Sequence, residues 1–559
     1  MTARVHLRRR LRTSGAILAL ALVATVSSLL GAVSPAAATS YVPVTGDGSS
    51  WSAGALDQWI ADVHADGIQI NFTPDGSSTG RQSFINGQSD FAASDIPFQT
   101  DPGDGSPPEN PKAGSYAYMP ITAGGTVFMY NLKINGQQVT NLRLSGVNMT
   151  KIFTGVITNW DDPALAADNP GLQLPNQTIV PVVRADGSGT SYELSEWMIS
   201  QNPGLWNAFC AKSGRAPACG ATSNYPTTTG MIAQNGDLGV ASYVAQSFAN
   251  GSIGYVNYYY ALAAKFPVAQ LLNSAGYYTE PTPQNVAVSL LQDKVDTTDV
   301  NNPALYLTQQ LSGVYTDPDP RTYPLSSYGY LILPTTVGNS FTTAKGATLA
   351  AFSYYAMCQG QQQSAALGYS PMPINLVQAA FAQIAKIPGA NVQSINIQNC
   401  NNPTFSPTGV NLLAQTAPYP PACDKQGPTQ CTTGTGGAVA VATPVSKGAA
   451  STSAGTTTGT TASSGGVTTG TGGTSGSATG SSASGGTEAS TTCDPSTGAC
   501  GTSGGTSSVD PTATTATLAS ATGWTSTQTL LVLIGLALLA LLLIPGLLSR
   551  RLDRKRSSP

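Results

Sequence analysis

The sequence predicts an α/β fold in two domains, built from residues 39 to about 410. Strand-like and helix-like runs alternate along this segment, a pattern typical of α/β proteins. The run GIQINF alternates apolar and polar residues as a strand does. The run ALDQWIADV has apolar residues at the helical positions Leu56, Trp59, Ile60 and Val63. The segment is also long enough for two domains.

The first 38 residues have the pattern of a secretory signal peptide. A basic stretch that ends at Arg12 precedes an apolar run from about Ala16 to Leu30, and the small residues Ala36-Ala37-Ala38 follow. We expect cleavage near Ala38. Because there is no cysteine at this point, a lipoprotein anchor is disfavoured.

A second apolar segment, from Leu530 to Leu548, predicts a transmembrane helix. Its 19 residues are uncharged, and about 20 apolar residues span a bilayer core. Trp524 precedes the run and the basic stretch SRRLDRKRSSP follows it, which places the C-terminus in the cytoplasm. A buried core helix fits this length and these flanks poorly. We therefore expect an exported cell-surface protein anchored in the cytoplasmic membrane, with its folded domains outside.

The cysteines agree with export. There are eight, and pairing neighbours gives Cys210/Cys219, Cys358/Cys400, Cys423/Cys431 and Cys493/Cys500. This pairing is a hypothesis, because a sequence does not fix connectivity. No CxxC occurs, which disfavours a zinc ribbon or a thioredoxin-like site. Structural disulfides formed in an oxidising compartment explain the pattern better.

The charge of the exported part disfavours nucleic acid as a partner. The formal net charge of the whole chain is −3. Five basic residues lie in the signal peptide, and five more lie in the tail with Asp553, which leaves 15 basic and 27 acidic residues outside. A nucleic-acid-binding surface would need a basic stripe instead. An anionic ligand would have to be held by local groups, since the global field repels it.

A composition change marks the end of the folded part. From about residue 432 to 523 the chain is Gly, Ser, Thr and Ala with almost no aromatic residues, too little apolar surface for a core. A flexible coil of about 90 residues has a root-mean-square span of about 50 Å, so we interpret it as a tether, glycosylated or not. The predicted order is signal peptide 1–38, first domain 39–127 and 327–410, second domain 128–326, disordered linker 411–523, transmembrane helix 524–548 and basic tail 549–559.

Three segments share a strand, a Gly/Ser turn and the start of a helix. They are YVPVTGDGSSWSAGALDQWI, IQINFTPDGSSTGRQSFI and IVPVVRADGSGTSYELSEWM. The first N–H groups of a helix have no intrahelical partner, so they form a ready anion site. Arg184 adds a bidentate donor suited to a tetrahedral oxyanion, and Asp186 would hold its guanidinium in place.

Each feature also has a structural explanation. A serine before a helix is usually an N-cap, and a single Gly-Ser turn indicates little. In SDFAASDIPF, Asp95 follows a run of small residues, as a carboxylate at a strand end might. On sequence alone, an N-cap or a surface acid is the favoured interpretation of Asp95. The three segments together with Arg184 favour an anion site more than any one of them does.

Four segments resemble motifs of the phosphate-binding protein of ABC phosphate transporters, the PstS family. TGDGSSW, DGSSTG, DFAASDIP and RADGSGTS stand where that family has TGAG-[AS]-[ST]-F, G-S-S-G, DF-x-A-S-D-x-P and R-x-DGSGT, in the same order. Similarity continues in IFTGVITNWDDPAL and GSIGYVNYYYA and covers roughly residues 41 to 400. The last two of the four motifs are specific, whereas the first two are weak alone.

The resemblance implies a type II periplasmic-binding fold, in which two α/β domains close on an anion like a Venus flytrap. It implies capture of inorganic phosphate for the permease subunits of an ABC importer. Carried over by motif, the phosphate contacts are Ser50, the Trp51 backbone N–H, Ser77, Asp95, Arg184, Ser188, Gly189 and Thr190, with Asp186 in support. Two positions depart from the family: Trp51 replaces a phenylalanine, and Thr79 replaces a glycine that many members have.

Asp95 would then select the ligand. A carboxylate that faces an oxyanion repels it unless the ligand brings a proton to donate. Phosphate at neutral pH carries such a proton and sulfate does not, so an accepting Asp95 would reject sulfate. This argument also disfavours other oxyanions that lack a proton.

The sequence does not favour an enzyme. His64 is the one histidine outside the signal peptide, and it follows the apolar face of a helix. Ser188 is not the centre of a G-x-S-x-G elbow, because Asp186 stands two positions before it. There is also no G-x-x-x-x-G-K-[ST] loop and no His/Asp cluster for a metal. We expect no catalytic residue, cofactor or metal. A surface sensor or adhesin on the same fold, without a transport role, stays open as an alternative.

Overall fold

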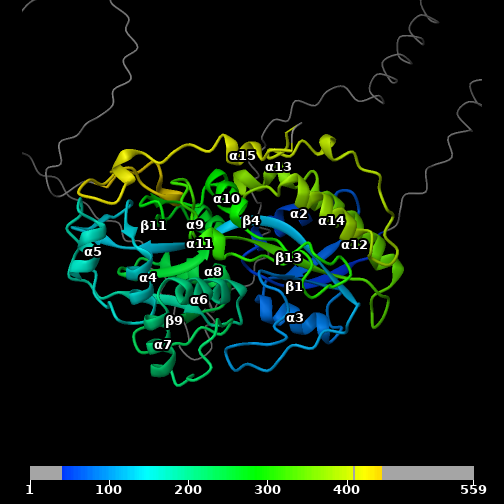
Figure 1. The fold of residues 1–559 in the computed structure, drawn as a ribbon, viewed down its shortest axis with the longest axis horizontal. Helices are drawn as coiled ribbons and strands as arrows, with labels where there is room; N and C mark the ends of the chain where they lie inside the picture. Colours follow the sequence, from blue (N-terminus) through cyan, green and yellow to red (C-terminus); the bar gives the residue numbers. More distant parts are fainter. Residues whose placement is uncertain (1–40, 407–408, 444–559) are drawn as a thin grey trace, which may run out of the picture. The chain divides into compact units, whose positions relative to one another are not determined.

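A computed structural model describes residues 41–406 and 409–443 of the chain (Figure 1). The predicted signal peptide, most of the linker, the transmembrane helix, the tail and the Cys493/Cys500 pair lie outside these residues. Within the described ranges, no helix is both long and apolar enough to cross a membrane.

One large mixed sheet organises the described residues. Its strand order is β2-β1-β3-β13-β4-β10-β8-β9. In addition, β11 pairs with β4, and β12 and β7 pair with β11. The strands are β1 (Val44–Gly48), β2 (Ile70–Thr73), β3 (Phe91–Ser94), β4 (Tyr116–Asn131), β7 (Arg143–Leu144), β8 (Val180–Arg184), β9 (Ile232–Gln234), β10 (Ser252–Asn257), β11 (Val268–Leu272), β12 (Tyr278–Thr279) and β13 (Ser326–Pro334). A separate ribbon joins β5 (Lys133–Ile134) to β6 (Gln137–Gln138). The prediction of alternating strands and helices is confirmed.

The long strand β4 joins the two halves of the sheet. Its first part pairs antiparallel with β13, from Tyr116 opposite Pro334 to Gly125 opposite Ser326. Its last part pairs antiparallel with β10. Every residue of β4 and of β13 is buried, because helices cover both faces of the sheet at this point. Both strands therefore lie at the junction of the two halves.

Two hydrophobic cores flank this junction. One is formed mainly by residues from 44–123 and 328–405, and we name that part lobe I. The other is formed by residues from 127–325, and we name that part lobe II. The α/β fold with two lobes agrees with the sequence. The exact domain boundaries stay a prediction, since a core cluster does not fix a boundary.

Helices cover the sheet in each lobe (Figure 1). Those of lobe I are α2 (Ala53–His64), α3 (Ser77–Ile85), α12 (Thr343–Met357), α13 (Gln361–Ser364) and α14 (Ile374–Ile384). Those of lobe II are α4 (Gly146–Phe153), α5 (Pro163–Asp168), α6 (Gly189–Gln201), α7 (Pro203–Lys212), α8 (Gly236–Val244), α9 (Tyr258–Ala264), α10 (Pro283–Ser289) and α11 (Ser312–Tyr315).

Three of the predicted disulfides are confirmed. Cys210 is bonded to Cys219, Cys358 to Cys400 and Cys423 to Cys431. The described cysteines are all paired in this way. The first bond joins Cys210 in α7 to the loop that follows this helix in lobe II, and the second joins the end of α12 to the chain near residue 400 in lobe I.

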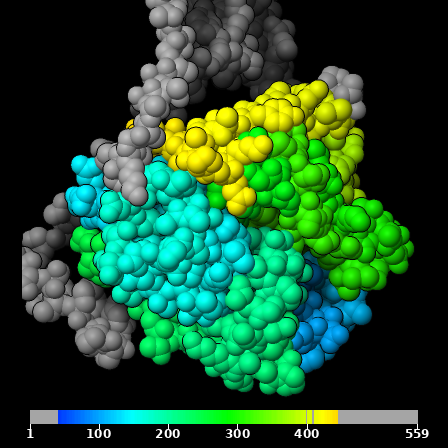
Figure 2. All heavy atoms as spheres, turned by 60° about the vertical axis from the view of Figure 1, so that its left-hand side comes forward, coloured from blue at the N-terminus to red at the C-terminus, as the bar shows by residue number. Residues whose placement is uncertain are grey.

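The chain beyond lobe I differs from the predicted linker, which was expected to begin at residue 411. Residues 409–443, named here the C-terminal strap, pack against the body and include α15 (Leu412–Gln415). Figure 2 shows this segment in yellow, lying across the top of the molecule in that view. It is ordered by specific contacts rather than by a large apolar core, which is why its composition did not reveal it.

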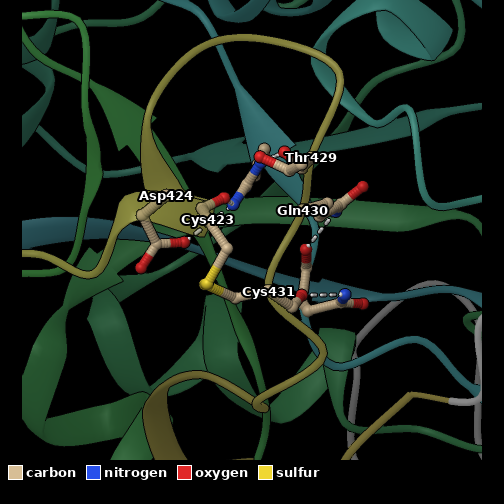
Figure 3. The surroundings of a disulfide bond; sticks show 7 residues. Cys423, Asp424, Thr429, Gln430 and Cys431 are labelled. Atoms are coloured by element: carbon tan, nitrogen blue, oxygen red, sulfur yellow. Dashed lines mark hydrogen bonds and ion pairs between the residues drawn. A yellow bond between two sulfur atoms is a disulfide. The ribbon is translucent and has the colours of Figure 1, made fainter. Parts of the chain in front are cut away.

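Buried polar contacts fix the strap to lobe II. Arg143 donates from Nη1 to the Thr429 carbonyl at 2.9 Å and pairs through Nη2 with Asp424 at 2.8 Å. Figure 3 shows Asp424 and Thr429 on the loop that the Cys423–Cys431 disulfide closes. Further along, Thr140 N donates to Thr443 Oγ1 at 2.6 Å. The chain therefore passes between the lobes three times: in β4, just before β13 and in the strap.

Candidate functional site

The three strand–turn–helix segments form as predicted and meet between the lobes. β1 is followed by α2, β2 by α3, and β8 by α6. The first two segments belong to lobe I and the third to lobe II. A backbone hydrogen bond of 2.9 Å from Ser78 N to the Gly187 carbonyl joins the second and third turns directly.

Asp95 is the centre of one half of the site. It follows β3 and is 2% exposed. Its carboxylate accepts hydrogen bonds from Ser49 Oγ at 2.5 Å and from Ser77 Oγ at 3.1 Å. Thr190 Oγ1 of lobe II reaches the same carboxylate at 3.5 Å. Serine and threonine hydroxyls from both lobes thus surround a single buried acid.

Gly189 lies against Asp95 and has room for no side chain. A Cβ atom on Gly189 would stand 2.7 Å from Asp95 Oδ2 and 2.9 Å from Ser77 Oγ. Because Gly189 is the first residue of α6, its glycine lets the start of this helix approach the carboxylate closely. The first N–H groups of a helix are the feature that favours anions, and in α6 the one at Ser191 is bonded to Ser188 Oγ.

Arg184 is the centre of the other half. Nε donates to Asp186 Oδ1 at 2.8 Å, and Nη2 also contacts the second oxygen of Asp186. Nη1 donates to Asp237 Oδ2 at 2.6 Å, and Nη2 donates to Ser50 Oγ at 2.9 Å. The guanidinium of lobe II therefore touches lobe I through Ser50.

Asp237 is a member of this cluster that the sequence reasoning missed. It lies in the first turn of α8 and is fully buried. Oδ2 accepts from Ser50 Oγ at 2.6 Å, and Oδ1 accepts from Asn257 N at 2.6 Å. An acid in the first turn of a helix is common, so the segment NGDLG gave no signal that distinguished it. Only the pairing of β8 with β9 and β10 brings it to Arg184.

Trp51 and Ser188 have structural partners in this molecule. Trp51 N donates to Ser49 Oγ at 3.1 Å, and its indole donates to Thr126 Oγ1 at 3.1 Å. Ser188 caps α6, since its Oγ accepts from Ser191 N at 3.3 Å. The structure thus brings Ser50, Ser77, Asp95, Arg184, Gly189 and Thr190 into contacts between the lobes. Trp51 lies in the core of lobe I, and Ser188 is bonded within lobe II.

Burial governs the protonation of the site. It raises the pKa of Asp95 to about 6, while the hydrogen bond from Ser49 acts to lower it and the charge of Asp237 raises it further. Burial also raises the pKa of Asp237, and Arg184 opposes this. Burial acts to lower the pKa of Arg184, but Asp237 and Asp186 together raise it. One permanent cation thus faces three acids, of which Asp95 is the one with no cation in direct contact.

Comparison with known proteins gives the class of protein. The family model described as the PBP superfamily domain matches residues 33–359. The chain belongs to this superfamily, and its two α/β lobes with a polar site between them are what the class would have.

Curated relatives give the particular family. The phosphate-binding protein PstS of Xylella fastidiosa is 31% identical over 61% of this chain and 84% of its own length. The phosphate-binding protein PstS 2 of Mycobacterium tuberculosis is 28% identical over 58% of this chain and 82% of its own. The chain is a member of the PstS family. A solved phosphate-binding protein bound with phosphate at pH 8.5 matches with 18% identity over 66% of this chain and 99% of its own, at a TM-score of 0.47, and the assignment does not depend on it.

Proposed function

We propose that this chain binds inorganic phosphate between its lobes and passes it to the permease subunits of an ABC importer. The observation that supports this most directly is the surroundings of Asp95. A single buried carboxylate is approached by the helix start at Gly189 and by hydroxyls from both lobes. The hydroxyls and the helix N–H groups would donate hydrogen bonds to an oxyanion, and the Asp95 carboxylate would accept one from it.

The acceptor decides which oxyanion fits. Phosphate in its monoprotonated or diprotonated form can donate to Asp95, whereas sulfate would leave two buried like charges in contact. Arg184, held by Asp186 and Asp237, would supply charge-assisted donors to the opposite side of the ligand. Ser50, Ser77, Thr190 and the backbone N–H of Gly189 complete the proposed contacts. Ser188 and the Trp51 N–H join them where the ligand replaces their local partners, Ser191 N and Ser49 Oγ.

The location follows from sequence patterns. An N-terminal signal peptide and a C-terminal apolar run would place the lobes outside the cytoplasmic membrane and tether them to it; both patterns lie beyond the described residues. A substrate-binding protein of an importer works at that location. The surface-sensor or adhesin alternative has no observation of its own in its favour.

Calorimetric titration of the purified full-length protein, stripped of co-purified anion, tests the ligand. We expect phosphate binding with a Kd in the micromolar range or tighter, and no heat with sulfate at pH 7.5. A folded, stripped sample that ignores phosphate would reject the proposed ligand. Equal affinity for both anions would reject the selecting role of Asp95.

Delivery needs a separate test in cells. Deleting the gene should slow phosphate uptake at low external phosphate, and the wild-type gene should restore it. An Asp186→Ala copy that is exported normally should restore uptake only partly, because Arg184 loses one of its two carboxylate supports. Unchanged uptake after deletion would leave phosphate binding in place but exclude a required role in import.

A further inference from the structure

Two loops meet across the lobe interface, outside the Asp95 and Arg184 clusters. The loop of lobe I contains Gly103 and Asp104, between β3 and β4. The loop of lobe II follows α7 and contains Arg215, Gly220 and Thr222. Gly220 N donates to the Gly103 carbonyl at 2.9 Å, and Thr222 Oγ1 donates to Asp104 Oδ2 at 2.7 Å. Arg215 Nη2 lies 3.5 Å from the same carboxylate oxygen.

The contact is tight and shielded. The side chain of Asp104 is 6% exposed and that of Arg215 17%. A Cβ atom on Gly220 would stand 2.5 Å from the backbone of Gly103, so the two glycines allow the backbones to touch. Partial burial acts to raise the pKa of Asp104, but the hydrogen bonds from Thr222 and Ser106 and the charge of Arg215 bring it below its ordinary value. Asp104 is therefore ionised at neutral pH.

Bonds within lobe II fix the conformation of its loop independently of the contact with lobe I. The Cys210–Cys219 disulfide ties it to the end of α7, and Trp206 Nε1 donates to the Cys219 carbonyl at 2.8 Å. Thr222 N donates to Ser195 Oγ of α6 at 2.9 Å. A fixed loop loses little conformational freedom when the lobes close, so more of the contact energy is available to the closed form.

The same loop is bonded to the anion-binding turn. Ser188 N donates to the Ser223 carbonyl at 2.9 Å, one residue beyond the threonine that holds Asp104. A pocket of about 360 Å³ lies beside the contact, and its lining includes Asp104, Ser78, Tyr192 and Ser223. The contact thus stands next to the turns of both lobes that meet at the anion site.

We propose that Gly103, Asp104, Arg215, Gly220 and Thr222 form an interlobe latch, with Asp104 as the positioning residue that sets how long bound phosphate is retained. None of these five residues is among the proposed phosphate contacts. The latch acts through the closed arrangement of the lobes, and this inference rests on the proposed function. Its contacts exist only when the lobes are together, so they oppose opening and leave the encounter with the ligand unaffected.

Stopped-flow measurement of phosphate release and capture tests the latch. Asp104→Ala removes both the ion pair and the acceptor for Thr222, and we expect release about tenfold faster with capture unchanged within about twofold. Asp104→Asn keeps an acceptor oxygen and should give a smaller increase. Gly220→Ala, which pushes the loops apart without changing charge, should also speed release.

Asp319→Ala is the matched control. Asp319 pairs with Arg321 at 2.7 Å within lobe II, and Arg321 also donates to the Ala414 and Ala417 carbonyls of the strap. The same substitution there breaks an Asp–Arg pair that takes no part in the contact between the two loops. Its release rate should equal that of the wild type. Unchanged release in folded Asp104→Ala, or an equal change in Asp319→Ala, would overturn the latch.

Amide hydrogen exchange at Gly220 separates this inference from the proposed function. Its N–H crosses the interface, so it should be protected in the wild type and exchange faster in Asp104→Ala, whichever anion the protein binds. Failure of the wild type to bind phosphate would reject the proposed ligand alone. Equal exchange of Gly220 N–H in both proteins would reject the latch alone.

Discussion

At the scale of single residues, the site is a balance of charges in a small buried volume. Arg184 is 2% exposed and contacts two carboxylates, whereas Asp95 contacts only hydroxyls. The two carboxylates fix the orientation of Arg184. Asp95 has no such ion pair, and its raised pKa of about 6 lets it gain or lose a proton near neutral pH. The fixed Arg184 suits the binding of an anion. The titratable Asp95 suits the selection of an anion by whether it carries a proton.

Replacing Arg184 should destabilise the protein as well as abolish phosphate binding. Arg184→Met leaves the buried Asp237 and the half-buried Asp186 without their cation, which costs about 3–5 kcal/mol of unfolding free energy. Adding Asp237→Asn should recover part of that loss, because one uncompensated charge disappears. Urea unfolding of both variants measures this. A double variant that is no more stable than Arg184→Met would contradict the charge argument.

The raised pKa of Asp95 makes anion selectivity depend on pH. Since the pKa lies at about 6, the acid is largely protonated at pH 5 and can then donate to sulfate. We expect sulfate binding to be measurable at pH 5 and absent at pH 8. Asp95→Asn, a neutral donor at every pH, should bind sulfate at both. Sulfate affinity that is equal at pH 5 and pH 8 in the wild type would contradict this role.

At the scale of elements, the three helix starts show how far a sequence can predict a site. Arg184, Asp186, Ser188 and Gly189 lie within one turn, so their spacing alone predicted their proximity. Asp237 is 53 residues from Arg184, and the pairing of β8 with β9 and β10 sets that contact. The sequence therefore predicts contacts between residues that are close along the chain. It does not predict contacts that depend on which strands pair in the sheet.

The start of α6 should tolerate no side chain. Gly189→Ala places a Cβ atom 2.7 Å from Asp95 Oδ2, so the helix must withdraw from the site and phosphate affinity should fall at least about tenfold. Gly204→Ala is the matched control, since Gly204 is near the start of α7 and its Cβ would meet nothing within 4 Å. Calorimetry should find Gly204→Ala unchanged. Normal affinity in Gly189→Ala would contradict the close approach.

At the scale of the whole molecule, the lobes could be predicted from alternating patterns but the C-terminal strap could not. Its few buried residues include Asp424 and Thr435, which are polar, and polar contacts at long range leave no periodic pattern in a sequence. The neighbouring cysteines Cys423 and Cys431 were the one signal of order there. They indicated a closed loop without indicating what it packs against.

Buried acids should make the ligand-free protein more stable in mild acid. Burial raises the pKa of Glu280 to about 7 and those of Asp95 and Asp293 to about 6. Because each folded pKa exceeds its unfolded value near 4, the folded state binds more protons between about pH 4 and 7, and stability falls as pH rises through that window. Thermal unfolding should give a higher Tm at pH 5 than at pH 8.

Glu280→Gln isolates one of these groups. Glu280 accepts a hydrogen bond from Gly436 N of the strap at 2.7 Å, so glutamine keeps an acceptor oxygen and removes the titration. The Tm difference between pH 5 and pH 8 should shrink in this variant. A difference as large as that of the wild type would mean that Glu280 does not contribute to it.

The strap also decides where a mechanical load would enter the protein. A pull on the chain beyond Thr443 acts first on its contact with Thr140 and next on Thr435, whose hydroxyl donates to the Val268 carbonyl at 2.5 Å. Both anchors belong to lobe II. A force applied from the C-terminal side therefore acts on lobe II alone and does not separate lobe II from lobe I. Tension on the chain would then not release an anion bound between the lobes.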